Sequence, residues 1–159
     1  MIKSPDFMEL ALDEAKAAGA RGEVPIGAVL SVKGAVIARA GNRTRELNDP
    51  TAHAEMLVIS QASRSLSAER LLEADLHVTL EPCAMCAAAI SFARVRRLYF
   101  GATDEKGGAV VSGVRFYASP TCHHAPDVYD GIAAHESAEI LRKFFRARRA
   151  PDDDQNPGT

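Results

Sequence analysis

The segment TLEPCAMC at residues 79–86 constrains this chain more than any other, because it places Cys83 and Cys86 three positions apart directly after Pro82. Proline is favoured at the start of a helix, where its missing N–H would have no partner anyway. Side chains three residues apart share a helix face, so both thiols lie together at the first turn. Such a pair is typical of a redox couple, of half a structural zinc site or of half a catalytic one.

The cysteine count and the N-terminus point to a reducing compartment. The chain has three cysteines, and an odd number fits a metal or redox role better than a disulfide scaffold. Residues 1–20 lack the apolar stretch and cleavage site of a secretory signal, so we expect a cytoplasmic protein. No apolar run approaches the length of a bilayer span, and we expect no membrane insertion.

Composition and charge indicate one globular domain. The chain has 159 residues, of which 47% are hydrophobic and 25% charged, and we expect a domain over residues 1–150. The polar tail at 151–159 is expected to be disordered. A net charge of -2 leaves nucleic-acid binding to a local patch, for which RKFFRARR at 142–149 is suited because it places aromatic rings among cations.

Hydrophobic patterning predicts alternating strands and helices. We expect four helices, over 6–19, from about Ala52, over 83–93 and over 135–149, and Thr51 is the expected cap of the second. We expect strands over 26–32, 35–40, 75–80, 97–102 and 127–132. The turn at Lys33-Gly34 makes the first two strands a hairpin, with Val29 and Val36 expected on one buried face. This order predicts an α/β fold, a three-layer α/β/α sandwich with a central mixed sheet.

The C-terminal helix is expected to be amphipathic. Its apolar residues recur at helical spacing, and we expect four of them to face inward: Ile140, Leu141, Phe144 and Phe145.

A histidine at a second helix start completes a candidate metal site. His53 follows a polar loop and opens a helix, while Cys83 and Cys86 open another after a strand, so the helix starts can converge at the carboxyl ends of the strands. The helix dipole is expected to lower the pKa of both thiols. Two thiolates and one imidazole make the ligand set of a catalytic zinc site with an open fourth position.

A fourth protein ligand would instead make the site structural. Cys122, His123 and His124 are the only other candidates, and they lie in a Gly/Pro-flanked loop without a ligand spacing. We expect them to be loop or structural residues, and their role stays open.

Glu55 follows His53 by two positions in the first helical turn. With the metal off the helix end, both side chains can reach it. A carboxylate beside a metal-activated water can act first as general base and then as general acid.

These residues carry a resemblance. HAE at 53–55 and PCAMC at 82–86 match the His-x-Glu and Pro-Cys-x-x-Cys signature of zinc-dependent nucleobase deaminases. The chain most resembles the bacterial tRNA-specific adenosine deaminases, in the blocks EVPIGAVL (23–30), GNR (41–43), NDPTAHAE (48–55), VTLEPCAMCAAAI (78–90), FGATDEKGGA (100–109) and FFRARR (144–149). Guanine deaminases share the NDPTAHAE-like block, whereas EVPIGA, VTLEPC and the arginine-rich helix favour the tRNA enzymes.

The resemblance implies a cytidine-deaminase-like fold and a chemistry. It implies that His53, Cys83 and Cys86 bind one zinc ion per chain and that Glu55 shuttles protons. The implied reaction is hydrolytic deamination of adenosine to inosine at the wobble position of tRNA.

It also implies substrate contacts. Asn42 would hydrogen-bond a flipped base, although an asparagine in a polar loop is otherwise an ordinary turn residue. Ala54 would supply a backbone contact, and Asp104 would meet the ribose or backbone, unless it merely caps its turn. Phe145 and Arg149, with Arg146 and Arg148, would meet flanking anticodon nucleotides.

The implied partners are the tRNA anticodon stem-loop and a second copy of the chain in a homodimer. Two alternatives stay open, a salvage deaminase of a free base, nucleoside or nucleotide of the guanine or cytosine type, and a zinc-stabilised RNA-binding module without catalysis. The acidic tail and CHHAPDVYDG at 122–131 depart from the family pattern.

Overall fold

A computed structural model describes residues 6–153 of the chain. Its elements follow in the order α1 (Phe7–Ala20), β1 (Gly27–Val32), β2 (Ala35–Gly41), α2 (Ala54–Ser65), β3 (Ala74–Leu80), α3 (Ala84–Phe92), β4 (Arg97–Ala102), a short 3-10 turn (Phe116–Ala118), β5 (Asp127–Tyr129) and α4 (Ala134–Asp153). Every strand and helix expected from the sequence is present, with shifted ends.

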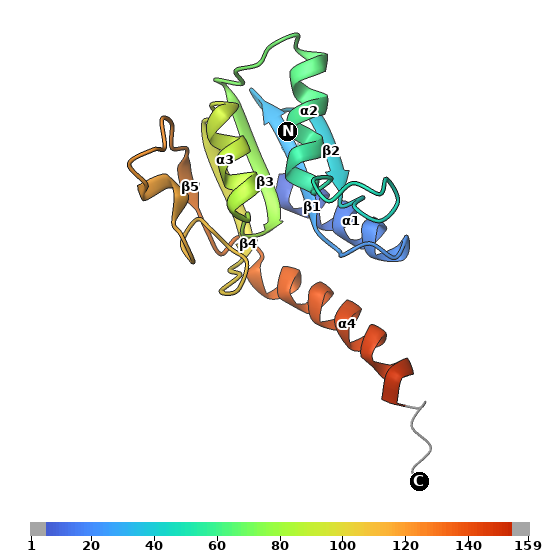
Figure 1. The fold of residues 1–159 in the computed structure, drawn as a ribbon. Helices are drawn as coiled ribbons and strands as arrows, with labels where there is room; N and C mark the ends of the chain where they lie inside the picture. Colours follow the sequence, from blue (N-terminus) through green and yellow to red (C-terminus); the bar gives the residue numbers. More distant parts are fainter. Residues whose placement is uncertain (1–5, 154–159) are drawn as a thin grey trace.

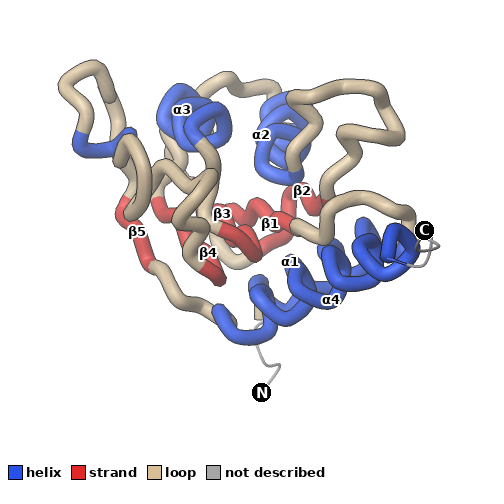
Figure 2. The backbone as a smooth tube through the Cα atoms, turned by 60° about the horizontal axis from the view of Figure 1, so that its bottom comes forward, coloured by secondary structure: helices blue, strands red, loops and turns tan. Residues whose placement is uncertain are grey.

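The strands form a five-stranded mixed sheet in the order β2-β1-β3-β4-β5. Strand β1 is antiparallel to both of its neighbours, while β3, β4 and β5 run parallel. Helices α2 and α3 lie on one face of the sheet, and α1 and α4 lie on the other (Figure 2). The expected three-layer α/β/α sandwich with a central mixed sheet is therefore confirmed.

Apolar side chains on both faces hold the layers together. On α1, Asp6 caps the helix by accepting hydrogen bonds from the N–H groups of Met8 and Glu9. The buried stripe of α1 packs under β1, and Gly27 permits this approach because a Cβ there would collide with the α1 backbone. In the centre, β3 and β4 pair at fully buried positions such as Val78 and Phe100.

The hairpin differs from the expectation in one respect. Val29 is fully buried, but Val36 is 38% exposed and pairs with Ser31. Val36 lies beside the turn of the edge strand β2, and the register shifts between Leu30 and Ser31. An edge strand has a neighbour on one side only, so an apolar residue there buries less of its surface.

Helix α4 runs beyond the edge of the sheet (Figure 1). Ile140, Leu141 and Phe144 are half-buried as expected, whereas Phe145 is 40% exposed, so the expectation that it faces inward is wrong. The helix continues to Asp153 rather than ending at 149. The rest of the tail expected at 151–159 lies outside the described residues.

Within residues 6–153, no helix combines the length and apolar character that a membrane crossing requires.

Candidate functional site

Two helix starts bring the predicted metal ligands together. Helix α2 begins at Ala54 with His53 in the N-cap position, and α3 begins at Ala84 with Cys83 in its N-cap position. Neither side chain makes a capping hydrogen bond to its helix. Both are thus available to a ligand at the end of the sheet where β3 stops.

The start of α2 differs from the expected start at Ala52. Thr51, the expected cap, donates its N–H and its hydroxyl to the carboxylate of Asp49 instead. Its side chain therefore stabilises the preceding turn and leaves the cap position to His53.

His53, Cys83 and Cys86 place their ligand atoms within 4.8 Å of one another. The Nδ1 atom of His53 lies 3.6 Å from the sulfur of Cys83 and 3.5 Å from that of Cys86. Nitrogen and sulfur donors in such an arrangement suit a first-row transition metal. The predicted three residues are therefore positioned to bind a metal.

The thiols of Cys83 and Cys86 differ in acidity. Hydrogen bonds with Cys86 and then His53 lower the pKa of Cys83 to about 4. The pKa of Cys86 is raised, chiefly by its hydrogen bond with Cys83 and by burial. The expectation of a lowered pKa therefore holds for Cys83 and not for Cys86. Metal binding must displace the proton that remains on Cys86.

Two of the three loop residues considered as a fourth ligand, Cys122 and His124, have other partners. The hydroxyl of Ser91 donates to the backbone carbonyl of His124 at 2.6 Å, and the thiol of Cys122 donates to the same oxygen. The ring of His124 hydrogen-bonds the carbonyl of Val95 at 2.7 Å. These contacts fasten the loop to the end of α3. Among the described residues, the metal cluster comprises His53, Cys83 and Cys86 only.

Glu55 is a buried acid in the first turn of α2. Burial is the main cause that raises the pKa of its carboxyl group. The Cys83 thiolate raises this pKa further, whereas His53 opposes the shift. A carboxyl group with a raised pKa beside a metal cluster can both accept and donate a proton.

Asn42 and Ala54 meet at the start of α2. The side-chain oxygen of the buried Asn42 accepts a hydrogen bond from the backbone N–H of Ala54 at 2.8 Å. The amide nitrogen of Asn42 donates to no acceptor among the described residues. The side chain thus fixes the helix start with one atom and keeps a donor for a ligand.

Asp104 and Phe145 line one pocket. Asp104 caps its own turn by accepting hydrogen bonds from the N–H groups of Lys106 and Gly107. A pocket of about 420 Å³ lies between this turn, the ends of β3 and β4, and α4, where Phe145 lines it. Arg149 lines an adjoining pocket that also contains Phe145 and Arg146. The structure therefore brings three predicted substrate residues to one side of the molecule.

Sequence reasoning missed two buried carboxylates, Glu23 and Glu81. Glu23 accepts hydrogen bonds from the backbone N–H groups of Arg45 and Glu46, in the loop before His53. Glu81 likewise binds the loop over 104–112. Burial alone would raise their pKa values, but these hydrogen bonds outweigh it and lower both. The sequence held no signal for either contact, because the partners are backbone N–H groups in loops distant along the chain.

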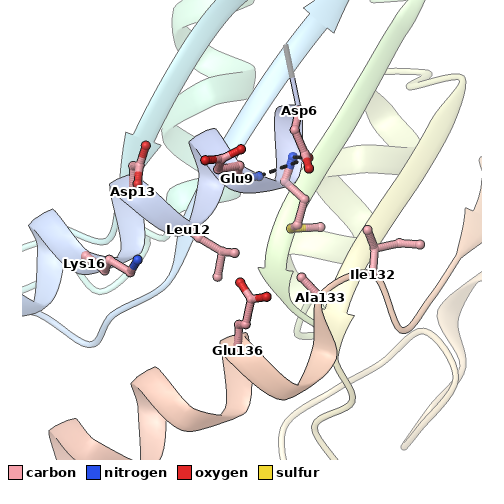
Figure 3. A pocket seen from close by; sticks show the side chains of 9 residues that line it. Asp6, Glu9, Leu12, Asp13, Lys16, Ile132, Ala133 and Glu136 are labelled. Atoms are coloured by element: carbon pink, nitrogen blue, oxygen red, sulfur yellow. Dashed lines mark hydrogen bonds between the residues drawn. The ribbon is translucent and has the colours of Figure 1, made fainter. Parts of the chain in front are cut away.

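A separate acidic hollow lies between α1 and the start of α4 (Figure 3). Asp6, Glu9, Asp13 and Glu136 line it. This layer covers the face of the sheet opposite to α2 and α3 (Figure 2), so the hollow is distinct from the metal cluster.

Comparisons with known proteins agree with this site. The model of the MafB19-like deaminase family matches residues 2–149. A tRNA-specific adenosine deaminase of Agrobacterium fabrum is 70% identical over 152 residues, which cover 96% of this chain and 100% of that protein. The protein of the same description from Bacillus subtilis is 44% identical over 149 residues, covering 94% of this chain and 92% of the relative.

Solved structures of deaminases also match this chain. A structure from a study of A-to-I editing by tRNA:A34 deaminases at the wobble position has a TM-score of 0.84 and 73% identity, and the match covers 85% of this chain and 98% of that one. The guanine deaminase of Nitrosomonas europaea has a TM-score of 0.75 at 23% identity, covering 87% and 82%, so that likeness concerns the fold alone. With a family model over most of its length and a relative at 70% identity, this chain belongs to the tRNA-specific adenosine deaminases.

Proposed function

We propose that this protein catalyses the hydrolytic deamination of adenosine to inosine at the wobble position of tRNA, with one zinc ion per chain. The observation that carries the proposal is the His53, Cys83 and Cys86 cluster beside the buried acid Glu55. The 70% identity to a tRNA-specific adenosine deaminase supports this substrate.

The ligand distances fit zinc. Tetrahedral zinc with bonds of about 2.3 Å to sulfur and about 2.0–2.1 Å to nitrogen places those donors about 3.5–3.6 Å apart. The separations of His53 Nδ1 from the two sulfurs are 3.6 and 3.5 Å. Three protein ligands leave the fourth tetrahedral position to a water molecule, as catalytic zinc sites require.

Zinc, when bound, acts as a Lewis acid that brings the pKa of a water molecule to about 7. Glu55 would accept a proton from the attacking water as its oxygen adds to C6 of the adenine ring, and would deliver that proton to the ring nitrogen N1. It would then take the proton of the new C6 hydroxyl and pass it to the amino group, which leaves as ammonia while C6 becomes a carbonyl. Water and adenosine thus yield inosine and ammonia, and Glu55 returns to its starting state.

Other residues hold the substrate. Asn42 offers its amide nitrogen to the flipped base, and the fixed start of α2 brings the Ala54 backbone beside it. Phe145 offers an exposed ring for base stacking, and Arg149 offers a cation to the phosphates. Asp104 meets the ribose or backbone from the turn that its own carboxylate caps. The anticodon stem-loop suits such a site, because its loop bases can be splayed out.

The experiment presents the purified, zinc-loaded protein with an anticodon stem-loop carrying wobble adenosine, and separately with free guanine, cytosine and cytidine. We expect inosine in the RNA and no turnover of the free compounds. Turnover of the free compounds alone would identify a salvage deaminase. The likeness to a guanine deaminase concerns only the fold and does not by itself favour that activity.

Glu55→Ala tests whether the site is catalytic. We expect this variant to bind zinc and RNA without deamination, while Glu69→Ala, which alters an exposed glutamate after α2, retains full activity. A Glu55→Ala protein that still deaminates the stem-loop would remove Glu55 from catalysis, whereas a wild-type protein that binds zinc and RNA without deamination would support the zinc-stabilised RNA-binding module. A tRNA substrate supports a cytoplasmic location, and the proposed active form is a homodimer.

A further inference from the structure

We propose that Glu81 is a positioning residue for RNA binding, because its buried carboxylate holds the loop at 103–112 in the shape that presents Asp104 and the adjoining pocket to the substrate. This inference rests on the proposed function. It assigns a task to a residue that neither binds the metal nor transfers protons.

One carboxylate oxygen of Glu81 binds the C-terminal end of the loop. Its Oε2 atom accepts hydrogen bonds from three consecutive backbone N–H groups, those of Val110 at 3.0 Å, Val111 at 2.9 Å and Ser112 at 2.9 Å. Successive N–H groups that converge in this way form a binding site for an anionic oxygen. The loop needs the carboxylate because these amides, which are buried or part-buried, would otherwise lack an acceptor.

The other carboxylate oxygen of Glu81 binds the N-terminal end of the loop. Its Oε1 atom accepts the backbone N–H of Asp104 at 3.0 Å and the hydroxyl of Ser112 at 2.9 Å. A single carboxylate therefore joins the first and last turns of the loop. Hydrogen bonds to an ionised acceptor are stronger than neutral ones, so the side chain can keep an otherwise irregular segment in one conformation.

Gly108 lies directly against the carboxylate of Glu81. A Cβ atom at this position would lie 2.5 Å from Oε1 of Glu81 and 2.5 Å from the carbonyl oxygen of Asp104. Both approaches are too close for any side chain. The loop thus has space for the carboxylate of Glu81 only because residue 108 is glycine.

The loop held by Glu81 adjoins both the metal site and the pocket. Glu81 directly precedes Pro82 and Cys83, and the carbonyl of Pro82 accepts the N–H of Ala109 at 2.9 Å. The first turn of the loop lines the pocket that also contains Phe145. Loosening the loop would therefore disturb a wall of the RNA site, while His53, Cys83 and Cys86 keep their own supports on α2 and α3.

Glu81→Gln gives a sharp test. If the amide oxygen stays on the three N–H groups of 110–112, the amide NH₂ must face the N–H of Asp104, which loses its acceptor. We expect faster hydrogen–deuterium exchange at 104–108, with a smaller effect at 110–112. We expect KM for the stem-loop to rise about tenfold, because one charge-assisted hydrogen bond is lost. The zinc content should be unchanged and kcat should stay within about twofold.

Two further variants separate positioning from general stability. Ser112→Ala removes only the hydroxyl bond to Glu81 and should raise KM in the same direction by a smaller factor, which keeps the test open if Glu81→Gln does not fold. Glu23→Gln alters an equally buried carboxylate and should speed exchange at 44–46 and not at 104–112.

Several results would overturn the inference while wild-type deamination remains intact. These are an unchanged KM in both loop variants, a loss of zinc in Glu81→Gln, or a fall in kcat with no change in KM. Absence of deamination by the wild-type protein would instead refute the proposed function.

Discussion

The side-chain oxygen of Asn42 accepts the backbone N–H of Ala54 at 2.8 Å, which ties the end of β2 to the first residue of α2. The helix start that carries His53 and Glu55 is thereby fixed from outside the helix. In the function proposed above, the same side chain offers its amide nitrogen to a base, so its oxygen and its nitrogen would serve different tasks.

Two substitutions at Asn42 should separate these tasks. Asn42→Ala leaves the buried N–H of Ala54 without an acceptor and should lower the free energy of unfolding by about 1–3 kcal/mol. Asn42→Asp keeps an acceptor, which the positive end of α2 favours, but cannot donate to the base. We expect it to retain stability while deamination falls on the order of 100-fold. Urea unfolding measures the stability of both variants, and stem-loop kinetics measure their deamination rates. An Asn42→Asp protein with wild-type activity would show that Asn42 does not recognise the base.

The three cysteines should differ in metal binding. Cys83→Ala and Cys86→Ala each leave two ligands, so the purified proteins should lose the metal, whereas Cys122→Ala should retain about one zinc per chain. The contrast follows from the partners of Cys122, which are Ser91 and the His124 carbonyl. Elemental analysis of the three variants measures it. Loss of zinc in a folded Cys122→Ala protein would contradict the assignment of three protein ligands.

The sequence predicted what local spacing and periodicity encode. Pro82 with the Cys83–Cys86 spacing indicated a helix start with two thiols, and the alternation of strands and helices indicated the layers. The metal cluster followed from these two patterns, because helix starts that follow strands converge at one edge of a sheet.

The contacts of Glu23 and Glu81 are of another kind. Their partners are backbone N–H groups in loops distant along the chain, and any residue type can supply such a group. No residue pattern marks them. The exposure of Val36 and the separate pKa values of Cys83 and Cys86 also depend on neighbours that only the folded chain brings together.

His77 should make stability depend on pH. It stacks on Tyr99 with ring centroids 4.3 Å apart, contacts Phe7, and burial lowers its pKa to about 4 although Asp75 and Asp6 oppose the shift. In the unfolded chain its pKa is about 6.5, so below that pH the unfolded state binds a proton that the folded state excludes. This contribution to the free energy of unfolding is present above pH 6.5 and is lost as pH falls toward 4.

His77→Phe keeps a ring in the stack and removes the titration. We expect its denaturant midpoint to fall less than that of the wild type between pH 7 and pH 5, with both proteins zinc-loaded. Because other groups titrate in both proteins, the difference between the two curves isolates His77. Parallel curves would show that His77 binds protons equally in the folded and unfolded states.

Arg148 and Arg149 are neighbours on α4 with different surroundings. The guanidinium of Arg148 lies 4.4 Å from the ring centroid of Phe144 and donates to the carbonyl of Gly22 at 2.5 Å, so it fastens α4 to the turn after α1. Arg149 lines the exposed pocket beside Phe145. We expect Arg148→Ala to lower the free energy of unfolding by about 1 kcal/mol.

Arg149→Ala should instead leave stability within about 0.5 kcal/mol of the wild type and weaken binding of the stem-loop. If Arg149 contacts a phosphate, the slope of log affinity against log salt should fall by about 1, because one fewer counterion is released on binding. Binding titrations at several salt concentrations, with Arg148→Ala as the matched comparison, measure this slope. A larger loss of slope in Arg148→Ala than in Arg149→Ala would reverse the two assignments, because an arginine held by Gly22 and Phe144 has little freedom to reach a phosphate.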